Sequence, residues 1–356
     1  MHIPDPRRYA QNVAGDELAT LAGTPQLRGR VDDLLSRGAD AVITYALRAA
    51  SSQSAYAGIW QTVCDAANHA GSHGDEAAIV ARVFALPLVI VTGSRRPASV
   101  PGVVPDIAAI TALFAEHGAL GPMRNFGLGN ALCSLETIES ILPSEIYAWT
   151  RDAGATRRDL PPSAIAIDEP GEKVHLRYLV GAAIAPVAEP SFVETASNIG
   201  VWGMPLTRAL AAQLAQKDVE VLPLARPPLD LLRAGQAGRY AQLDAAFNLF
   251  VSNAVRRVRS ATGDPDAVIS AHDDGDIRIG LSSPFDETLA EGFRWPLHPL
   301  DDIAEVTGAI TGLLAACRVN SVRCAGAVLP ALNANGQPWF ARPRDLDASS
   351  PGMARH

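Results

Sequence analysis

The C-terminal half of the chain repeats one order of elements, and this repetition constrains the fold more than any other feature. Residues 163–184, SAIAIDEPGEKVHLRYLVGAAI, read as two strands around Pro170-Gly171, because proline fixes φ and glycine accepts a positive φ in a type II turn. An alanine-rich helix over 205–216 and a short strand over 219–224 follow. This first set has the order β-β-α-β.

The same order returns closer to the C-terminus. Residues 266–283 read as a second hairpin, followed by a helix over 300–317 and a strand over 321–330. An amphipathic helix from Arg239 to Arg259 separates the two sets. Its apolar stripe consists of Tyr240, Leu243, Phe247, Phe250, Ala254 and Val258. The sequence therefore predicts a duplicated region over 164–335, with two β-β-α-β units joined by this helix.

The N-terminal half has a different texture. Apolar residues recur at helical spacing over 31–50 and 55–70, and FALPLVIVTG, residues 84–93, reads as a buried strand because it is a short β-branched run that ends at glycine. A helix over 104–118 follows, with Asp106 in its first turn and Gly118 as its stop. We expect a helix-rich α/β region over 26–150.

The regions around these elements lack periodicity. Residues 151–163, RDAGATRRDLPPS, combine glycine, charge and two prolines, which predicts a linker between the halves. Residues 1–25 and 340–356 are predicted to be flexible ends. Together the patterns predict an α/β (α+β) fold, with a mostly helical N-terminal half that holds at least one buried strand.

Composition narrows the class of protein. A chain of 356 residues with 48% hydrophobic content is typical of a globular protein. Its net charge is −8, and its lysines and arginines form no basic stripe, which disfavours nucleic acid as a partner. No window approaches the roughly 18 uncharged apolar residues of a membrane helix, so no membrane partner is expected. Only Lys173 and Lys217 of the basic residues are lysines, which with the many alanines favours a GC-rich bacterial genome.

The cysteines indicate the compartment. The chain has four cysteines, Cys64, Cys133, Cys317 and Cys324. They form no C-x-x-C pair and have no spacing typical of a zinc site. Such residues are expected to be reduced core residues, which together with the absence of an export signal predicts a cytoplasmic protein.

SAHDDGDIRIG, residues 270–280, is the densest group of metal-capable side chains. Asp274-Gly275 suits the centre of a two-residue type I′ turn, which would place Asp273 opposite Asp276, His272 opposite Ile277 and Ser270 opposite Ile279. His272 would then lie on the apolar face and the two aspartates on the other. This pattern favours a solvated turn, and Asp273 and Asp276 are only weak metal candidates.

An anion site is the stronger alternative. Ser94, Arg95 and Arg96 follow the strand over 84–93, at a position where open α/β sheets bind ligands, and Arg124 lies in a glycine-containing loop. These four residues could hold a carboxylate or phosphate. Against this, the chain has no glycine-rich phosphate fingerprint, and Asp106 would repel an anion at the next helix, so a solvated loop is the favoured interpretation of Ser94–Arg96.

Other charged groups have structural explanations. His69 and His73 are separated by glycines that favour a helix cap over a two-histidine zinc face. Arg256, Arg257 and Arg259 end a helix, where the dipole favours cations.

Two functional hypotheses follow. The favoured one is a cytoplasmic bacterial binding, assembly or regulatory protein without catalytic activity, which associates with a protein partner or with itself and needs no cofactor. It predicts an exposed apolar patch of several hundred Å². The alternative is an enzyme or small-ligand binder that acts on an anionic metabolite at the Ser94–Arg96 loop, with Arg124 as a further candidate.

Overall fold

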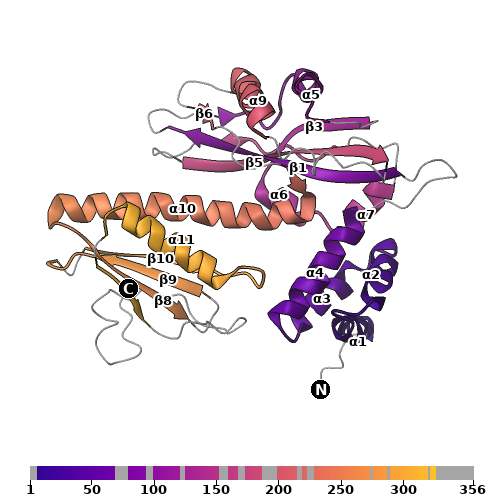
Figure 1. Ribbon diagram of the computed structural model, residues 1–356, viewed down its shortest axis with the longest axis horizontal. Helices are drawn as coiled ribbons and strands as arrows, with labels where there is room; N and C mark the ends of the chain where they lie inside the picture. Colours follow the sequence, from indigo (N-terminus) through magenta and orange to yellow (C-terminus); the bar gives the residue numbers. More distant parts are fainter. Residues whose placement is uncertain are drawn as a thin grey trace. The chain divides into compact units, whose positions relative to one another are not determined.

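The mixed α/β class expected from the sequence is confirmed by a computed structural model of the chain (Figure 1). The model describes residues 6–68, 79–93, 99–120, 125–151, 159–166, 173–186, 199–214, 219–222, 228–272, 276–286, 289–319 and 321–325. The chain divides into two compact units, Met1–Gln242 and Leu243–His356.

The first unit is built on an antiparallel sheet with the strand order β3-β5-β1-β6, to which β7 adds on β1. Its strands are β1 (Ile79–Thr92), β3 (Asn125–Cys133), β5 (Lys173–Pro186), β6 (Val219–Val221) and β7 (Leu229–Asp230). The two long strands β1 and β5 pair along their whole length, from Ile79 opposite Pro186 to Thr92 opposite Lys173. Two short strands, β2 (Ser99–Val100) and β4 (Ile165–Ala166), pair separately.

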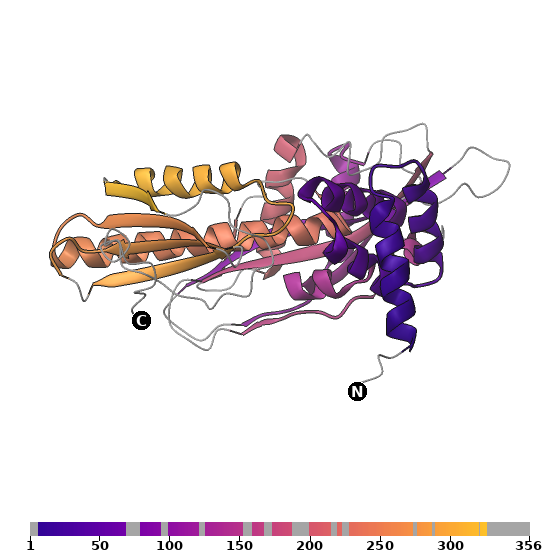
Figure 2. The ribbon, with the colours of Figure 1, turned by 90° about the horizontal axis from the view of Figure 1, so that it is seen from below.

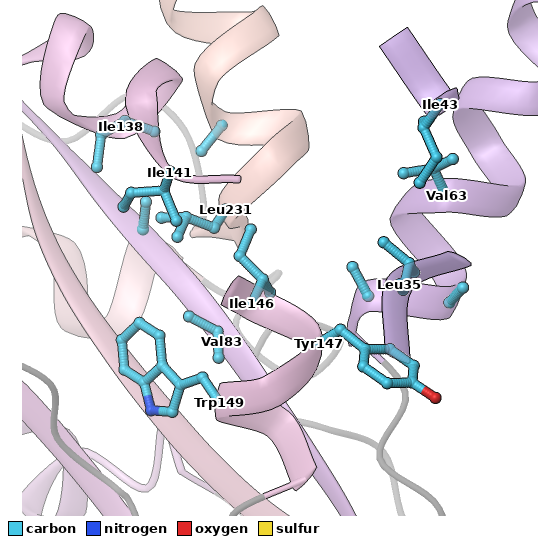
Figure 3. Packing of buried hydrophobic residues seen from close by; sticks show 14 of the residues in the cluster. Leu35, Ile43, Val63, Val83, Ile138, Ile141, Ile146, Tyr147, Trp149 and Leu231 are labelled. Atoms are coloured by element: carbon cyan, nitrogen blue, oxygen red, sulfur yellow. The ribbon is translucent and has the colours of Figure 1, made fainter. Parts of the chain in front are cut away.

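Helices cover both faces of this sheet, so both faces of β1 are apolar. One face carries α1 (Pro6–Thr20), α2 (Gln26–Ser36), α3 (Asp40–Ala49), α4 (Gln53–Asn68), α6 (Leu135–Ser140), α7 (Pro143–Arg151) and the start of α10 (Leu231–Ala261). Figure 3 shows part of this core, where Tyr147 of α7 lies beside Leu35 and Trp149 lies toward the strand that carries Val83.

The other face carries α5 (Ile107–Glu116) and α9 (Ile199–Leu214) side by side. Their inward residues pack on Phe84, Leu86 and other even-numbered residues of β1, because side chains alternate between the faces of a strand. The helix predicted over 104–118 is α5, but Asp106, expected in its first turn, is its N-cap and accepts a hydrogen bond from the Ala109 N–H at 3.0 Å. Gly118, the predicted stop, follows the helix with a φ of +64°.

The second unit is a four-stranded sheet with the order β10-β9-β8-β11, seen from a second side in Figure 2. Its elements are the C-terminal part of α10, β8 (Asp266–His272), β9 (Asp276–Ser282), β10 (Ala290–Pro296), α11 (Ile303–Ala316) and β11 (Ser321–Ala325). Phe247 of α10 packs on Phe293 and Trp295 of β10, with ring centroids 5.2 Å and 5.9 Å apart. Phe247, Ala254 and Val258 of the predicted stripe are buried, and Phe247 packs on the sheet, whereas Tyr240 belongs to the first unit.

The predicted pairing of the first hairpin is wrong. β4 pairs with β2, and β5 pairs with β1 and β3, so the strands on either side of Pro170-Gly171 are not partners. The second set has a third strand, β10, and its last strand β11 runs parallel to β8, whereas β6 of the first set is antiparallel to β1. Alternation along a strand identifies its faces and leaves its partner open, which explains the error.

The predicted register of the second hairpin is wrong by one residue. His272 lies opposite Asp276 and Ser270 opposite Arg278, because three residues, not two, connect the strands. Asp276 and Arg278 therefore share one face, while Ile277 and Ile279 share the other, which packs on the helices. A one-residue shift exchanges the faces of a strand.

The domain boundaries in the structure differ from those predicted from the sequence. Residues expected to be a flexible N-terminus form α1, whose Leu18 is fully buried in the core. The predicted linker 151–163 does not separate two domains, since β3 before it pairs with β5 after it. The predicted tail 340–356 lies outside the described residues.

Candidate functional site

The residues of the predicted anion site fall in parts of the chain that the structure does not describe. Ser94, Arg95, Arg96 and Arg124 all lie there, as do His69 and His73, so their convergence stays a prediction. The strand that leads to the first three is described, and it ends at Thr92.

A row of basic side chains lies next to that strand end. Lys173, His175 and Arg177 alternate along β5 and share the face of Thr92, which lies opposite Lys173. Thr92 Oγ1 is 3.0 Å from His175 Nε2. Burial, and then the charges of Arg177 and Lys173, lower the pKa of His175 below its ordinary value. The arrangement therefore favours the neutral form of the His175 imidazole.

Asp276, the described member of the weak metal pair, lies in β9 and is 2% exposed. Its carboxylate accepts a hydrogen bond from Arg294 Nε on β10, and Arg278 Nη2 lies 4.0 Å from the same oxygen. Two guanidinium groups therefore surround Asp276, which gives it a structural role in balancing buried positive charge. Asp273 falls outside the described part. Among the residues that are described, no group of three or more His, Cys, Asp or Glu side chains could hold a metal ion.

The arginines at the end of α10 make structural bonds, and Cys64 and Cys133 lie in the core as predicted, but the prediction is wrong for Cys317, which is half-buried, and for Cys324, which is exposed. Arg259 donates to Asp264 and to the carbonyls of Cys317 and Arg318 just after α11, and Arg257 pairs with Glu291. Burial raises the pKa of the Cys133 thiol to about 11, and it raises that of Cys64 further. Both thiols stay protonated at neutral pH, so neither is an activated nucleophile.

A wide hollow on the helical layer lies between α2 and α7. It has a volume of about 820 Å³, including open solvent, and Arg151 stacks over the Tyr147 ring at its wall, 4.2 Å from the centroid. Its other polar groups make structural bonds: Ser144 donates to Asp40, and Glu145 accepts from the Leu142 N–H. The hollow is an open surface whose polar groups hold the ends of helices.

The outer surface of α5 and α9 combines exposed apolar side chains with few charges. Val201 and Met204 of α9 are 48% and 45% exposed, one helical turn apart. On α5 the outward positions are the small residues Ala108, Ala112 and Ala115. We call these exposed stripes of the two helices the outer helical face.

The sequences of the two helices explain this surface. α5 reads IAAITALFAE and α9 reads IGVWGMPLTRALAAQL, so each has one charged residue, Glu116 and Arg208 respectively. A helix that is apolar all round is typical of one buried on all sides. Here only the inward side is buried, through Ile110 and Phe114 of α5 and the opposite stripe of α9. The helices therefore carry more apolar surface than the fold of one chain uses.

The sequence contained a signal for this surface that the hydrophobic patterns alone did not single out. The helix was predicted to begin at Pro205, whereas α9 begins at Ile199 and contains Pro205, so Val201 and Met204 lie outside the predicted helix. A helix on one face of a sheet needs only one apolar stripe, and residues 199–214 have apolar residues on both sides. Two-sided apolarity in a helix next to a single sheet would have identified it.

Comparison with protein-family models, curated proteins and solved structures finds no match to this chain. No helix within the described ranges is long and apolar enough to cross a lipid bilayer.

Proposed function

We propose that this chain is a cytoplasmic protein-binding or assembly protein, and that its partner docks on the outer helical face. The observation that carries the proposal is that α5 and α9 are apolar on the side that faces away from the sheet. Exposed apolar surface of this kind is typical of interaction sites. A cytoplasmic location agrees with the four free cysteines.

The double variant Val201→Asp/Met204→Asp tests this function. Two carboxylates in the centre of a docked surface would be desolvated without a partner, so we expect the affinity for the native partner to fall at least about 100-fold. The melting temperature should stay nearly unchanged, because both side chains are about half exposed. Native mass spectrometry of protein purified from its own cells measures the bound fraction.

Val13→Asp is the matched control. Val13 lies in α1 and is 40% exposed, so it is also an apolar helical residue at the surface, on the other side of the sheet. This variant should keep the native association. An association that survives both substitutions on α9 would refute the proposed function.

A second candidate function, binding of a small carboxylate or phosphate, is favoured by the basic row on β5. An anion held beside His175 would stabilise the imidazolium, so inorganic phosphate should raise the pKa of His175, which Arg177, Lys173 and burial otherwise lower. An NMR titration of the His175 ring measures this, with sodium chloride at equal ionic strength as the control. An identical pKa in both salts would contradict anion binding at this end of the sheet.

A further inference from the structure

The outer helical face has two unlike halves, a ridge and a floor. Val201 and Met204 project from α9, whereas the stripe on α5 consists of alanines and is flat. The helices run antiparallel: Gln213 exchanges two hydrogen bonds with the backbone of Asp106, at 2.8 Å and 3.1 Å, and Trp202 packs on Phe114 at the other end. Met204 therefore lies level with residues 112 and 113 of α5.

Charge on this face is sparse and balanced. On the described outer stripes, Arg208 is the single exposed cation and Glu116 the single exposed anion. A surface with no net charge can face a copy of itself without like-charge repulsion. A nucleic acid or a strongly charged peptide would find little to bind here.

We infer that the occupant of the outer helical face is a second copy of this chain, an inference that rests on the proposed function. A two-fold axis parallel to the helices places α9 of one copy over α5 of the other, and the reverse contact follows by symmetry. The Met204 ridge of each copy then packs on the floor around Ala112 of its partner. Ridge and floor are complementary in shape, and the four helices, two from each copy, pack as two layers between the two sheets.

The size of the face sets the strength of the dimer. α9 has 16 residues and α5 has 10, so they are about 24 Å and 15 Å long, and at about 10 Å width each the pair presents on the order of 400 Å² per copy. The total of about 800 Å² lies below the roughly 1,000 Å² of a stable specific interface, which is typical of a weak, transient one. The dimer should therefore form in the micromolar range and depend on protein concentration.

Sedimentation velocity of the full chain tests the inference, over loading concentrations from about 1 µM to about 100 µM. We expect a monomer at the low end and a dimer at the high end. Met204→Asp should raise the dissociation constant at least about 100-fold, because the two-fold axis places two new carboxylates in one small interface. The Val13→Asp control should dimerise like the wild type.

Disulfide trapping tests the packing mode, in a Cys317→Ser/Cys324→Ser background that removes the accessible native thiols. A mixture of Met204→Cys and Ala112→Cys chains should give a mixed disulfide dimer under mild oxidation, because the two positions face each other. A mixture of Met204→Cys with Ala304→Cys, an exposed position on α11, should not.

The outcomes separate the two proposals. A wild-type chain that stays monomeric, but whose native complex with another protein is lost in Val201→Asp/Met204→Asp, overturns the dimer and leaves the proposed function standing. A dimer that Met204→Asp leaves intact, or that traps equally through Ala304→Cys, overturns the packing on this face. If the variants keep both the dimer and the native complex, the dimer and the proposed function are both overturned.

Discussion

Replacement of Asp276 with alanine is expected to lower the local free energy of unfolding of the second unit by about 3–5 kcal/mol. Asp276 is 2% exposed, accepts a hydrogen bond from Arg294 and lies beside Arg278, which is also 2% exposed. Removal of the carboxylate leaves buried positive charge without its balancing anion. Such a loss costs more than the pair itself contributes, because the remaining cation stays desolvated.

Hydrogen exchange of the β8 and β9 backbone amides measures this change, since it reports the opening of this sheet rather than of the whole chain. Asp264→Ala is the matched control: Asp264 pairs with Arg259 in the same unit, but its side chain is 58% exposed. Exposed ion pairs contribute about 0–1 kcal/mol. Equal effects of the two substitutions would show that Asp276 is solvated like Asp264.

Gly181→Ala is expected to destabilise the first unit by about 3 kcal/mol. Gly181 lies in the middle of β5, where an added Cβ would be 2.6 Å from the Gly127 carbonyl oxygen of β3 and 2.6 Å from Phe84 of β1. The backbone oxygen cannot move without separating the two strands. The substitution should therefore lower the denaturant midpoint strongly.

Gly58→Ala is the control, and its expected effect on stability has the opposite sign. Gly58 lies inside α4, and an added Cβ there would meet no atom within 4 Å. Alanine favours a helix over glycine by about 0.5–1 kcal/mol, so this variant should be slightly more stable than the wild type. Denaturant unfolding of both variants gives the comparison, and a destabilised Gly58→Ala would contradict the packing of α4.

The close contact at Gly181 also shows why part of the fold could not be predicted. Residues 121–134 contain Gly127 and Gly129, and a loop between helices is the usual interpretation of such glycines. Residues 125–133 are instead β3, and Gly127 allows the close approach of β5. A glycine required by a neighbouring strand looks the same in a sequence as a glycine required by a turn.

Local elements were predicted well where one chain segment determines them. The helix predicted over 104–118 is found as α5, and the strand predicted over 84–93 is found as part of β1, which ends at Thr92, because caps and hydrophobic runs act over a few residues. Pairing was predicted poorly, as for β4 and β5, because partners depend on the whole sheet.

The candidate sites, like the strand pairing, depend on the tertiary structure and could not be predicted from local sequence patterns. Asp276 and Arg278 alternate with isoleucines, which is typical of a solvated strand face, but the structure buries both as an ion pair. The outer helical face depends on knowing that α5 and α9 cover one face of a single sheet. The exposed apolar stripe of α9 can be identified as a candidate binding surface only once that topology is known.

Hydroxyl-radical footprinting of Met204 shows whether a partner covers the outer helical face, because methionine oxidises readily and Met204 is about half exposed in the single chain. Oxidation is measured by peptide mass spectrometry in the native assembly and in the diluted, dissociated chain. We expect assembly to protect Met204, while Phe285, which is 80% exposed on the second unit, reacts equally in both. Equal oxidation of Met204 in both states would contradict a partner on the outer helical face.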